Sequence, residues 1–580
     1  KKLYLLIFHF CLFVSFSFSQ QKAVQVSGTP SYSYLHRNYI STGFFNNGIS
    51  DFDISQSNPG LVYPKLSGKT AMFVSGFLWG TKIAGDEIPH VGGSAYRSGL
   101  QPGRILNSGL PWELLTSEDP NASNVRIYKI RRDVYPGGPF IDLSEEATIE
   151  SKSESEIRLQ YETDWTEWPA ADGAPYEDVN INGVYEPSVD VPGFKGADQT
   201  IWFVANDLNQ SQSQFLYGTG PIGMEVQVTI WSYFQHEAVN HVFFKKYRLI
   251  NKSNTTFDST YISMWADPDI GDAGDDFAGC DTTLSLCYAY NGNDYDEMYE
   301  FTPPAIGFTL LKGPSIDEFT SLDMTASYYF ARGDPNVGDP LQGDSQGSVE
   351  FYNFMQGKFG ISGAPFIDLA TGEVTTYALN GDPITLTGWI DGLQLPTGDR
   401  RIGISSGPFN MAPGDTQEVY FSEVLGIGEN RIESIQYLRF HSILSKDLYE
   451  NNFNFTKLPT IPTPSLSIEQ VDNHFNLSWG ADSSTVNAIE NFNQDGFSFQ
   501  GYNVYQLAST STFQNSGHRL ATFDLQDGIT QISGTVMDPN GYPISGTIYP
   551  GNDTGIMREF VTTSDVIDNT YFIPGKKYYF

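Results

Sequence analysis

Apolar and polar residues alternate along several stretches of the chain. From position 224 to position 230 the even-numbered residues are Met, Val, Val and Ile, and the residues between them are Glu, Gln and Thr. A period of two places the apolar side chains on one face of a strand. Further β-rich runs are found at Val242–Ile250, Thr260–Ala266, Thr283–Tyr290 and Gln417–Leu425. The pattern therefore predicts an all-β protein built of several β-sandwiches.

One segment has helical periodicity instead. Between Glu429 and Glu450 the apolar residues recur at helical spacing, at Ile432, Ile435, Leu438, Leu444 and Leu448. Glu429 stands in the expected first turn, where the helix dipole favours a negative charge. We therefore expect one helix, at about 429–450, appended to the β architecture.

Composition marks the boundaries of the predicted domains. Two lysines, the apolar run Leu3–Phe18 and small residues at 17 and 19 are typical of a secretory signal, which we place at 1–19. No later apolar run is long enough to cross a bilayer, so we expect no transmembrane span in the mature chain. Three prolines indicate a stiff linker at 458–464. Residues 20–457 then form a large β-rich region of one or two sandwiches, and residues 465–580 form a separate domain.

The last of these domains resembles a fibronectin type III module. Trp479 ends one strand-like stretch, Gly501–Tyr505 is the next, and Gly575–Phe580 is a late one. A Trp on an early strand and a Tyr on a late strand form the usual core pair of such a sandwich. Because residues 465–580 exceed the usual length, we expect an insertion around Gly528–Asn552 in a module that is truncated before its last strand.

Charge narrows the range of partners. The formal net charge is −35, from 33 basic and 68 acidic residues, and this sign repels nucleic acid and anionic membrane surfaces. Carboxylates also supply the oxygen ligands that Ca²⁺ prefers. The two cysteines beyond the signal segment, Cys280 and Cys287, are compatible with a disulfide that closes a small loop or with two free thiols.

The first candidate metal site begins at Asp178. Oxygen-bearing side chains at positions 1, 3 and 5 of this segment, followed by Gly at position 6, match the start of an EF-hand-type calcium loop. The expected acid at position 12 is replaced by Val189, and an acid follows one residue later, so the segment resembles the calcium loops of dockerins and related repeats. An Asx-rich turn without metal is the alternative. The predicted Ca²⁺ ligands are Asp178, Asn180, Asn182, Val184 through its carbonyl, Glu186 and Asp190.

The second candidate metal site is an acidic segment in the middle of the chain. Five Asp residues fall within ten positions, with no Lys or Arg among them and with Gly271 and Gly274 to give the backbone freedom. Such crowding is unfavourable in a packed fold unless a cation or open solvent screens it. The alternatives are a solvated acidic loop and a catalytic carboxylate pair of the glycosidase type. The predicted ligands are Asp267, Asp269, Asp272, Asp275 and Asp276.

Aromatic residues near the first loop suggest a second kind of binding. Trp165 and Trp168, with Tyr161 and Tyr176, are candidate carbohydrate contacts because aromatic rings stack on sugars; packing in a core is the alternative.

The segment 403–407 matches the G-x-S-x-G motif of serine hydrolases but lacks the strand-turn-helix context that this motif requires. We therefore expect a protein without catalytic activity.

Several segments of the region from about 30 to 455 resemble large, poorly characterised secreted proteins of Bacteroidetes-like bacteria. The segments are Gly196–Phe203, Asp269–Leu286, Ser406–Phe409 and Ala412–Glu418. The resemblance implies export by type IX secretion and a place outside the cell or on its outer surface. We therefore expect a calcium-stabilised structural or adhesion protein whose partner is an extracellular surface protein or a glycan. A carbohydrate-binding or polysaccharide-degrading protein is the alternative.

Overall fold

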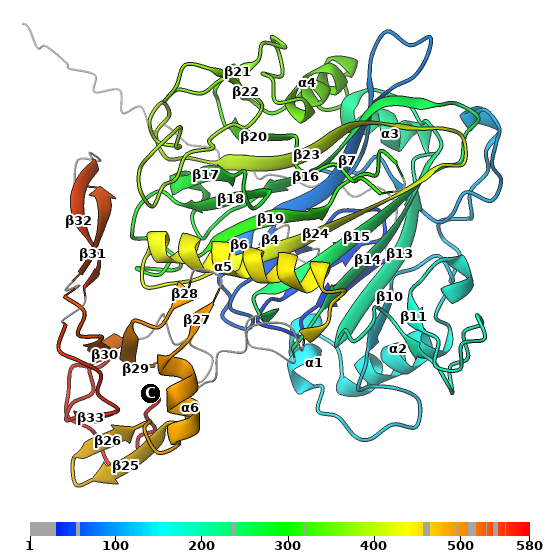
Figure 1. The fold of residues 1–580 in the computed structure, drawn as a ribbon. Helices are drawn as coiled ribbons and strands as arrows, with labels where there is room; N and C mark the ends of the chain where they lie inside the picture. The colour runs from blue at the N-terminus through cyan, green and yellow to red at the C-terminus, as the bar shows by residue number, and fades with distance from the viewer. Residues whose placement is uncertain are drawn as a thin grey trace, which may run out of the picture.

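The computed structural model describes residues 31–53, 58–234, 239–317, 319–455, 464–494, 497–507, 518–528, 531–537, 543–550 and 553–580. The predicted signal segment 1–19 and nearly all of the predicted linker 458–464 lie outside the described residues. The described part is mostly antiparallel β-sheet (Figure 1). This confirms the expected class of the fold.

Two antiparallel sheets face each other in the large N-terminal region. The strand order of the larger sheet is β10 (Tyr128–Arg131), β13 (Gln199–Asn206), β14 (Met224–Ser232), β15 (Val242–Asn251), β24 (Thr416–Gly426), β19 (Ala305–Lys312), β18 (Leu286–Asn291) and β17 (Asp276–Asp281), and β9 (Gln101–Pro102) also pairs with β13. The order of the smaller sheet is β20 (Ala326–Ala331), β23 (Arg400–Met411), β16 (Phe257–Asp267), β7 (Val74–Lys82) and β8 (His90–Gly93).

The main hydrophobic core lies between these two sheets. Val226, Val228 and Ile230 of β14 point into it, as their alternation predicts. From the opposite sheet, Phe77 of β7 stacks on Tyr247 of β15 with ring centroids 4.1 Å apart. The polar residues of β14 are buried as well, because other segments cover the outer face of the larger sheet. One core therefore joins segments from Leu35 to Ile427.

The predicted helix is α5 (Arg431–Glu450), and it covers the outer face of the larger sheet (Figure 1). It begins after Asn430, whose side-chain oxygen accepts hydrogen bonds from two backbone N–H groups of the first turn. Ile435 and Leu438 are fully buried in a second core that also contains Trp231 and Phe244. The position of this helix agrees with the sequence prediction.

Among the residues that the structure describes, five further α-helices and several short strands surround the sheets or belong to the C-terminal part, so the prediction of a single helix was wrong. Several of these helices are short or rich in polar residues, which hides them from a periodicity search. The helices are α1 (Ser144–Glu150), α2 (Glu154–Thr166), α3 (Gln210–Tyr217), α4 (Ser345–Met355) and α6 (Ser483–Glu490). The short strands are β1 (Tyr32–Leu35), β2 (Thr42–Phe45), β3 (Phe52–Asp53), β4 (Asn58–Pro59), β5 (Leu61–Val62), β6 (Thr70–Met72), β11 (Tyr176–Glu177), β12 (Val191–Pro192), β21 (Phe366–Ile367) and β22 (Val374–Thr375).

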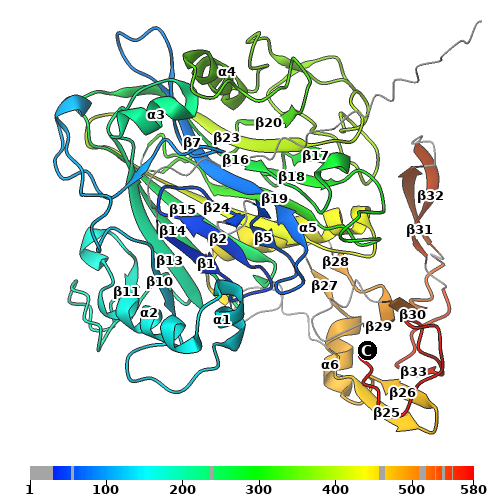
Figure 2. The same ribbon diagram turned by 180° about the vertical axis from the view of Figure 1, so that it is seen from behind.

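The C-terminal part is a set of small antiparallel sheets (Figure 2). Trp479 is buried there with Leu477, Val504 and Phe523, as expected for a core Trp. The late segment 575–580 forms only an isolated bridge, between Tyr579 and Leu507, and not the predicted strand. The strands are β25 (Ser467–Val471), β26 (His474–Ser478), β27 (Asn493–Gln494), β28 (Phe497–Ser498), β29 (Gly501–Gln506), β30 (His518–Asp524), β31 (Gln531–Met537), β32 (Pro543–Pro550) and β33 (Glu559–Thr562), of which β31 and β32 pair as a hairpin at the place of the expected insertion.

The two cysteines are direct cross-strand partners. Cys280 of β17 faces Cys287 of β18, and both are buried as free thiols. Burial raises the pKa of the Cys280 thiol to about 12, so this thiol is protonated and unreactive at neutral pH.

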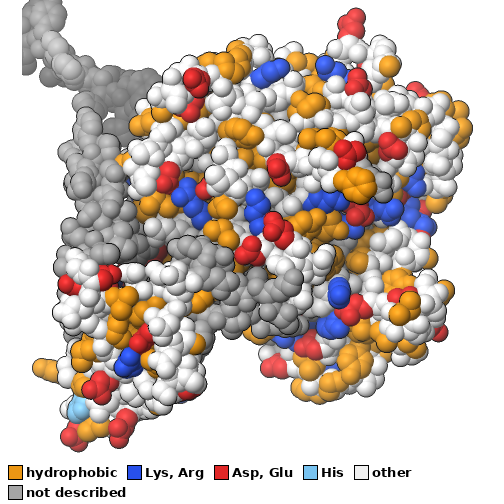
Figure 3. Space-filling model, in the orientation of Figure 1, with side chains coloured by type: hydrophobic (Ala, Val, Ile, Leu, Met, Phe, Trp, Pro, Cys, Tyr) orange, Lys and Arg blue, Asp and Glu red, His pale blue; other side chains and the backbone are white. Residues whose placement is uncertain are grey.

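On the face of the molecule shown in Figure 3, acidic and basic side chains are interspersed among apolar and neutral ones. Among the described residues, no helix combines the length and the apolar character that a bilayer crossing requires.

Candidate metal centres

The first predicted calcium loop is closed at its base by a small hairpin. Strand β11 pairs with β12 through Tyr176 with Pro192 and Glu177 with Val191, so residues 178–190 form the loop between them. At the start of the loop, the carboxylate of Asp178 accepts hydrogen bonds from the backbone N–H groups of Asn182, at 3.1 Å, and Gly183, at 2.7 Å. Gly183 has a φ of +76°, the left-handed conformation that glycine tolerates best.

The other predicted ligands of this loop are connected to the same loop by hydrogen bonds. The carboxylate of Asp190 is buried and accepts hydrogen bonds from the N–H groups of Val179, at 2.9 Å, and Glu186, at 2.8 Å. The carboxylate of Glu186 accepts from the side-chain amides of Asn180 and Asn182, each at 2.7 Å. An amide that turns over presents its carbonyl oxygen in place of its NH₂ group. Hydrogen bonds therefore link three carboxylates and two amides within the loop, although among the described residues the carboxylate oxygens of Asp178, Glu186 and Asp190 do not all lie within 4.8 Å of one another.

Val184 takes part through its backbone. Its N–H donates to the side-chain oxygen of Asn182 at 2.8 Å, while its side chain is exposed. All six residues predicted from the sequence thus belong to one hydrogen-bonded loop.

The two tryptophans beside the loop anchor it to the body of the protein. Trp165 and Trp168 are only 6% and 4% exposed, and their indole N–H groups donate to the carbonyls of Pro187 and Pro175. Tyr185 of the loop donates in turn to the carbonyl of Trp165. A sugar-stacking platform needs an exposed ring face, and these two indoles do not provide one.

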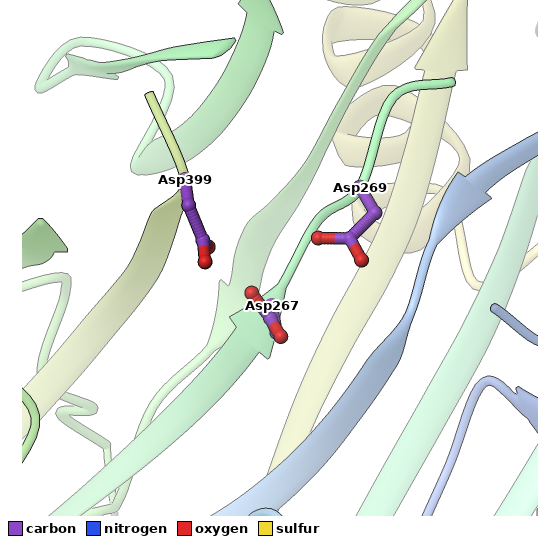
Figure 4. A group of neighbouring side chains, drawn as sticks. All are labelled: Asp267, Asp269 and Asp399. Atoms are coloured by element: carbon purple, nitrogen blue, oxygen red, sulfur yellow. The ribbon is translucent and has the colours of Figure 1, made fainter. Parts of the chain in front are cut away.

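The second predicted segment contributes to two neighbouring acidic groups. In the first, Asp267 at the end of β16 and the nearby Asp269 meet Asp399, which precedes β23 (Figure 4). One carboxylate oxygen from each residue lies within 4.8 Å of the others. Asp399 is more than a hundred positions away in the sequence, so only the pairing of β16 with β23 reveals it.

The side chain of Arg401 supplies a positive charge to the first group. The Arg401 guanidinium lies 3.1 Å from Asp399 and 3.4 Å from Asp267, and its Nε donates to the hydroxyl of Tyr96. Tyr96 donates to the other oxygen of Asp267 at 2.7 Å. Burial alone would lower the pKa of Arg401, but the surrounding carboxylates raise it above its ordinary value. Arg401 therefore offsets much of the negative charge of Asp267 and Asp399.

The second group centres on Asp276, the first residue of β17. Asp276 is fully buried, and its Oδ2 accepts from the backbone N–H of Ile270 at 3.2 Å. Among the described residues no hydrogen-bond partner is found for its Oδ1. Burial, and then the nearby carboxylates of Asp269, Asp275 and Asp296, raise the pKa of Asp276 well above its ordinary value. A buried carboxyl among other carboxylates is a favourable place for a cation.

The remaining acids of this segment hold the surrounding turn. Asp275 accepts from the amide of Asn293 at 2.8 Å, and Asp296 accepts from the backbone N–H of Asp272 at 2.8 Å. Gly271 is required beside them, because a Cβ there would lie 2.0 Å from the Asp296 carboxylate. Asp272 itself accepts from the N–H of Gly274. The five predicted acids therefore divide. Asp267 lies beside Arg401, Asp275 and Asp276 belong to the second group, Asp269 belongs to both, and Asp272 lies in the adjoining turn.

Comparison with known proteins adds no family to this description. No protein-family model matches the chain, and no curated protein matches it significantly.

Proposed function

We propose that this chain is a secreted or cell-surface structural or adhesion protein, without catalytic activity, whose fold is stabilised by bound Ca²⁺. The observation that carries the proposal is the loop 178–190. Its carboxylates and amides are linked by hydrogen bonds above a hairpin, and the carboxylate of Asp178 accepts a hydrogen bond from the N–H of Gly183 at the sixth position. Ca²⁺ takes six to eight oxygen ligands, and backbone carbonyls and water complete such a set.

The second acidic group supports a structural role for the ion. Asp276 is buried at the start of β17, and Asp296 belongs to a separate turn after β18. A cation bound between them would join the end of the larger sheet to that turn. Because such an ion binds only the folded chain, it raises stability by mass action, by about 2.7 kcal/mol at a hundred times its dissociation constant.

The burial of Trp165 and Trp168 weighs against the carbohydrate-active alternative. The two indoles singled out in the sequence are buried, and the Asp267–Asp399 pair is occupied by Arg401. We propose an extracellular surface protein or glycan as the partner, bound by a surface that these residues do not define.

Thermal unfolding tests the proposal. We expect a higher melting temperature in millimolar CaCl₂ than in EDTA, because the ion binds only the folded state. Asp178→Ala and Asp276→Asn should each remove part of this difference, and the double variant most of it. Asp334→Ala is the matched control, since Asp334 also accepts a backbone hydrogen bond in a turn but lies outside both sites. Equal melting temperatures with and without calcium would overturn the proposal.

A further inference from the structure

Three ionisable side chains meet without solvent in the main core. Lys245 of β15, Glu423 of β24 and Asp51, which follows β2, are each fully buried. The Lys245 Nζ lies 3.0 Å from the Oδ2 of Asp51 and 2.8 Å from the Oε2 of Glu423. One amine thus contacts two carboxyl groups from different parts of the chain.

The walls of this site exclude water and orient the Asp51 carboxyl. Aromatic rings of Phe44, Phe243 and Phe308 surround the ammonium, with centroids 5.2 to 5.5 Å from Nζ. The hydroxyl of Thr42 donates to the Oδ1 of Asp51 at 2.7 Å. The hydroxyl of Ser75 donates to Oδ2, and the Nζ of Lys245 donates to the same Ser75 oxygen at 3.2 Å. Both oxygens of the Asp51 carboxyl are therefore held in place.

With Glu423 protonated, the three side chains together carry no net charge. Burial, with the nearby Asp51 carboxylate, raises the pKa of Glu423 to about 8, so Glu423 is mostly protonated at neutral pH. Although burial opposes it, the two carboxyl groups raise the pKa of Lys245 above its ordinary value. Transfer of one proton from the Lys245 ammonium to the Asp51 carboxylate gives an amine beside a carboxylic acid, and the number of bound protons stays the same. A low-dielectric core favours the uncharged pair more than water does.

We propose that the chain joins Lys245 to Asp51 by an intramolecular isopeptide bond, with Glu423 as the group that transfers protons. The inference stands on the distances and burial of these residues and does not depend on calcium or on the proposed function.

The chemistry needs no added reagent. A proton passes from the Lys245 ammonium to the Asp51 carboxylate, and the free amine then attacks the Cγ of Asp51. The hydrogen bond from Thr42 stabilises the negative charge that develops on Oδ1. Glu423, which is protonated at the start, gives its proton to Oδ2, which leaves as water, and takes the second proton from Nζ. One C–N bond forms, one C–O bond breaks, and Glu423 regains its initial state.

The product explains why charged groups are placed in this core. A buried ion pair contributes little net stability because desolvation offsets the attraction. The amide removes both charges and fastens Asp51, near the N-terminal strands, to the central strand β15. A covalent link of this kind suits a protein that experiences force or proteases outside the cell.

Peptide mapping of the full chain by mass spectrometry tests the proposal. Without the bond, trypsin cuts after Lys245. With the bond, it skips Lys245, and the digest contains the peptide Asn38–Lys65 joined to Gly196–Lys246 and lighter than their sum by one water. Fragmentation of this species should place the link at Asp51 and Lys245. Because wild-type protein is used, the result does not depend on the folding of any variant. Separate unmodified peptides would overturn the proposal.

Variants then assign the roles. Lys245→Arg should abolish the joined peptide. Glu423→Gln should lower its yield at least tenfold relative to wild-type protein prepared in the same way, because the amide of Gln cannot exchange the protons. Lys246→Arg is the matched control, since Lys246 is the next residue on β15 but pairs at 2.8 Å with Glu418 on the other face. The linked peptide should be as abundant in this control as in the wild type, apart from the changed residue. Equal yields from Glu423→Gln and wild type would remove Glu423 from the mechanism.

Discussion

His441 of α5 lies face to face with His241, which directly precedes β15, and the burial of both rings makes the fold sensitive to acid. The rings of His241 and His441 are nearly parallel with centroids 4.5 Å apart, and His441 Nδ1 donates to the carbonyl of Leu425 at 2.6 Å. Burial lowers the pKa of His441 to about 4. Burial and the neighbouring His441 lower the pKa of His241 well below its ordinary value.

The sign of the pH effect follows from these shifts. Between pH 6.5 and 4 the unfolded chain binds a proton at His441 that the folded chain does not, so stability is complete above this window and falls as the pH drops through it. His441 alone should cost about 2 kcal/mol of unfolding free energy between pH 7 and pH 5. Urea denaturation at the two pH values measures this loss. His441→Gln should reduce it, whereas His474→Gln, on the distant strand β26, should not.

At the scale of single residues, the sequence predicts which side chains could bind a metal better than it predicts which of them lie together in the fold. The spacing of Asp178, Asn180 and Asn182 is local, so their convergence in one loop follows from the chain itself. Asp399 joins Asp267 only because β23 pairs with β16 across a long stretch of sequence. The triad of Lys245, Asp51 and Glu423 has the same origin, and no local pattern indicates it. A lysine in the middle of an aromatic β-strand was the one signal present.

At the scale of elements, the contact between α5 and β24 depends on one glycine. A Cβ at Gly426 would lie 2.3 Å from the backbone nitrogen of Leu438 and 2.3 Å from the carbonyl oxygen of Ser434. Backbone atoms of a helix cannot yield as a side chain can. Gly426→Ala should therefore push the helix away from the sheet and lower the unfolding free energy by about 1–3 kcal/mol or more.

A second glycine provides the control for this prediction. A Cβ at Gly220 meets nothing within 4 Å, so Gly220→Ala should change the stability by less than about 0.5 kcal/mol. Chemical denaturation of both variants measures the difference. If the two variants were equally stable, the close approach of α5 to β24 would not matter energetically.

Elements with strong periodicity could be predicted, and short polar ones could not. The helix predicted from Glu429 to Glu450 begins at Arg431 and ends at Glu450. Helix α2 was missed because only four of its thirteen residues are buried, although Ser153 and Glu156 form a capping box that could have located it. The run predicted from Thr283 starts as a strand only at Leu286, because Asp281 accepts hydrogen bonds from the N–H groups of Thr283 and Leu284 in a turn.

At the scale of the whole molecule, acidic residues outnumber basic ones by 68 to 33, and the buried cations have acidic neighbours. Lys245, Arg400 and Arg401 are each ion-paired inside the sandwich. Surface carboxylates then dominate the net charge, and a divalent cation relieves their mutual repulsion where they are crowded. The excess of surface carboxylates thus accounts both for the net charge of the chain and for its proposed need for calcium.

We expect the sandwich and the C-terminal part to unfold separately, because the interactions seen between them among the described residues are partly exposed polar contacts. Glu429, just before α5, accepts a hydrogen bond from Tyr505 and pairs with Arg519 at 3.1 Å. Partly exposed ion pairs of this kind contribute about 0–1 kcal/mol. In the part of the chain that the structure describes, the C-terminal core cluster holds four buried residues, whereas the main core extends across both large sheets. Calorimetry should therefore show two transitions, with the C-terminal part melting first.

Glu429→Gln should shift the first transition only slightly, and a chain ending at residue 455 should keep the second unchanged. A single transition lost as a whole on this truncation would instead mean that the two parts fold as one unit.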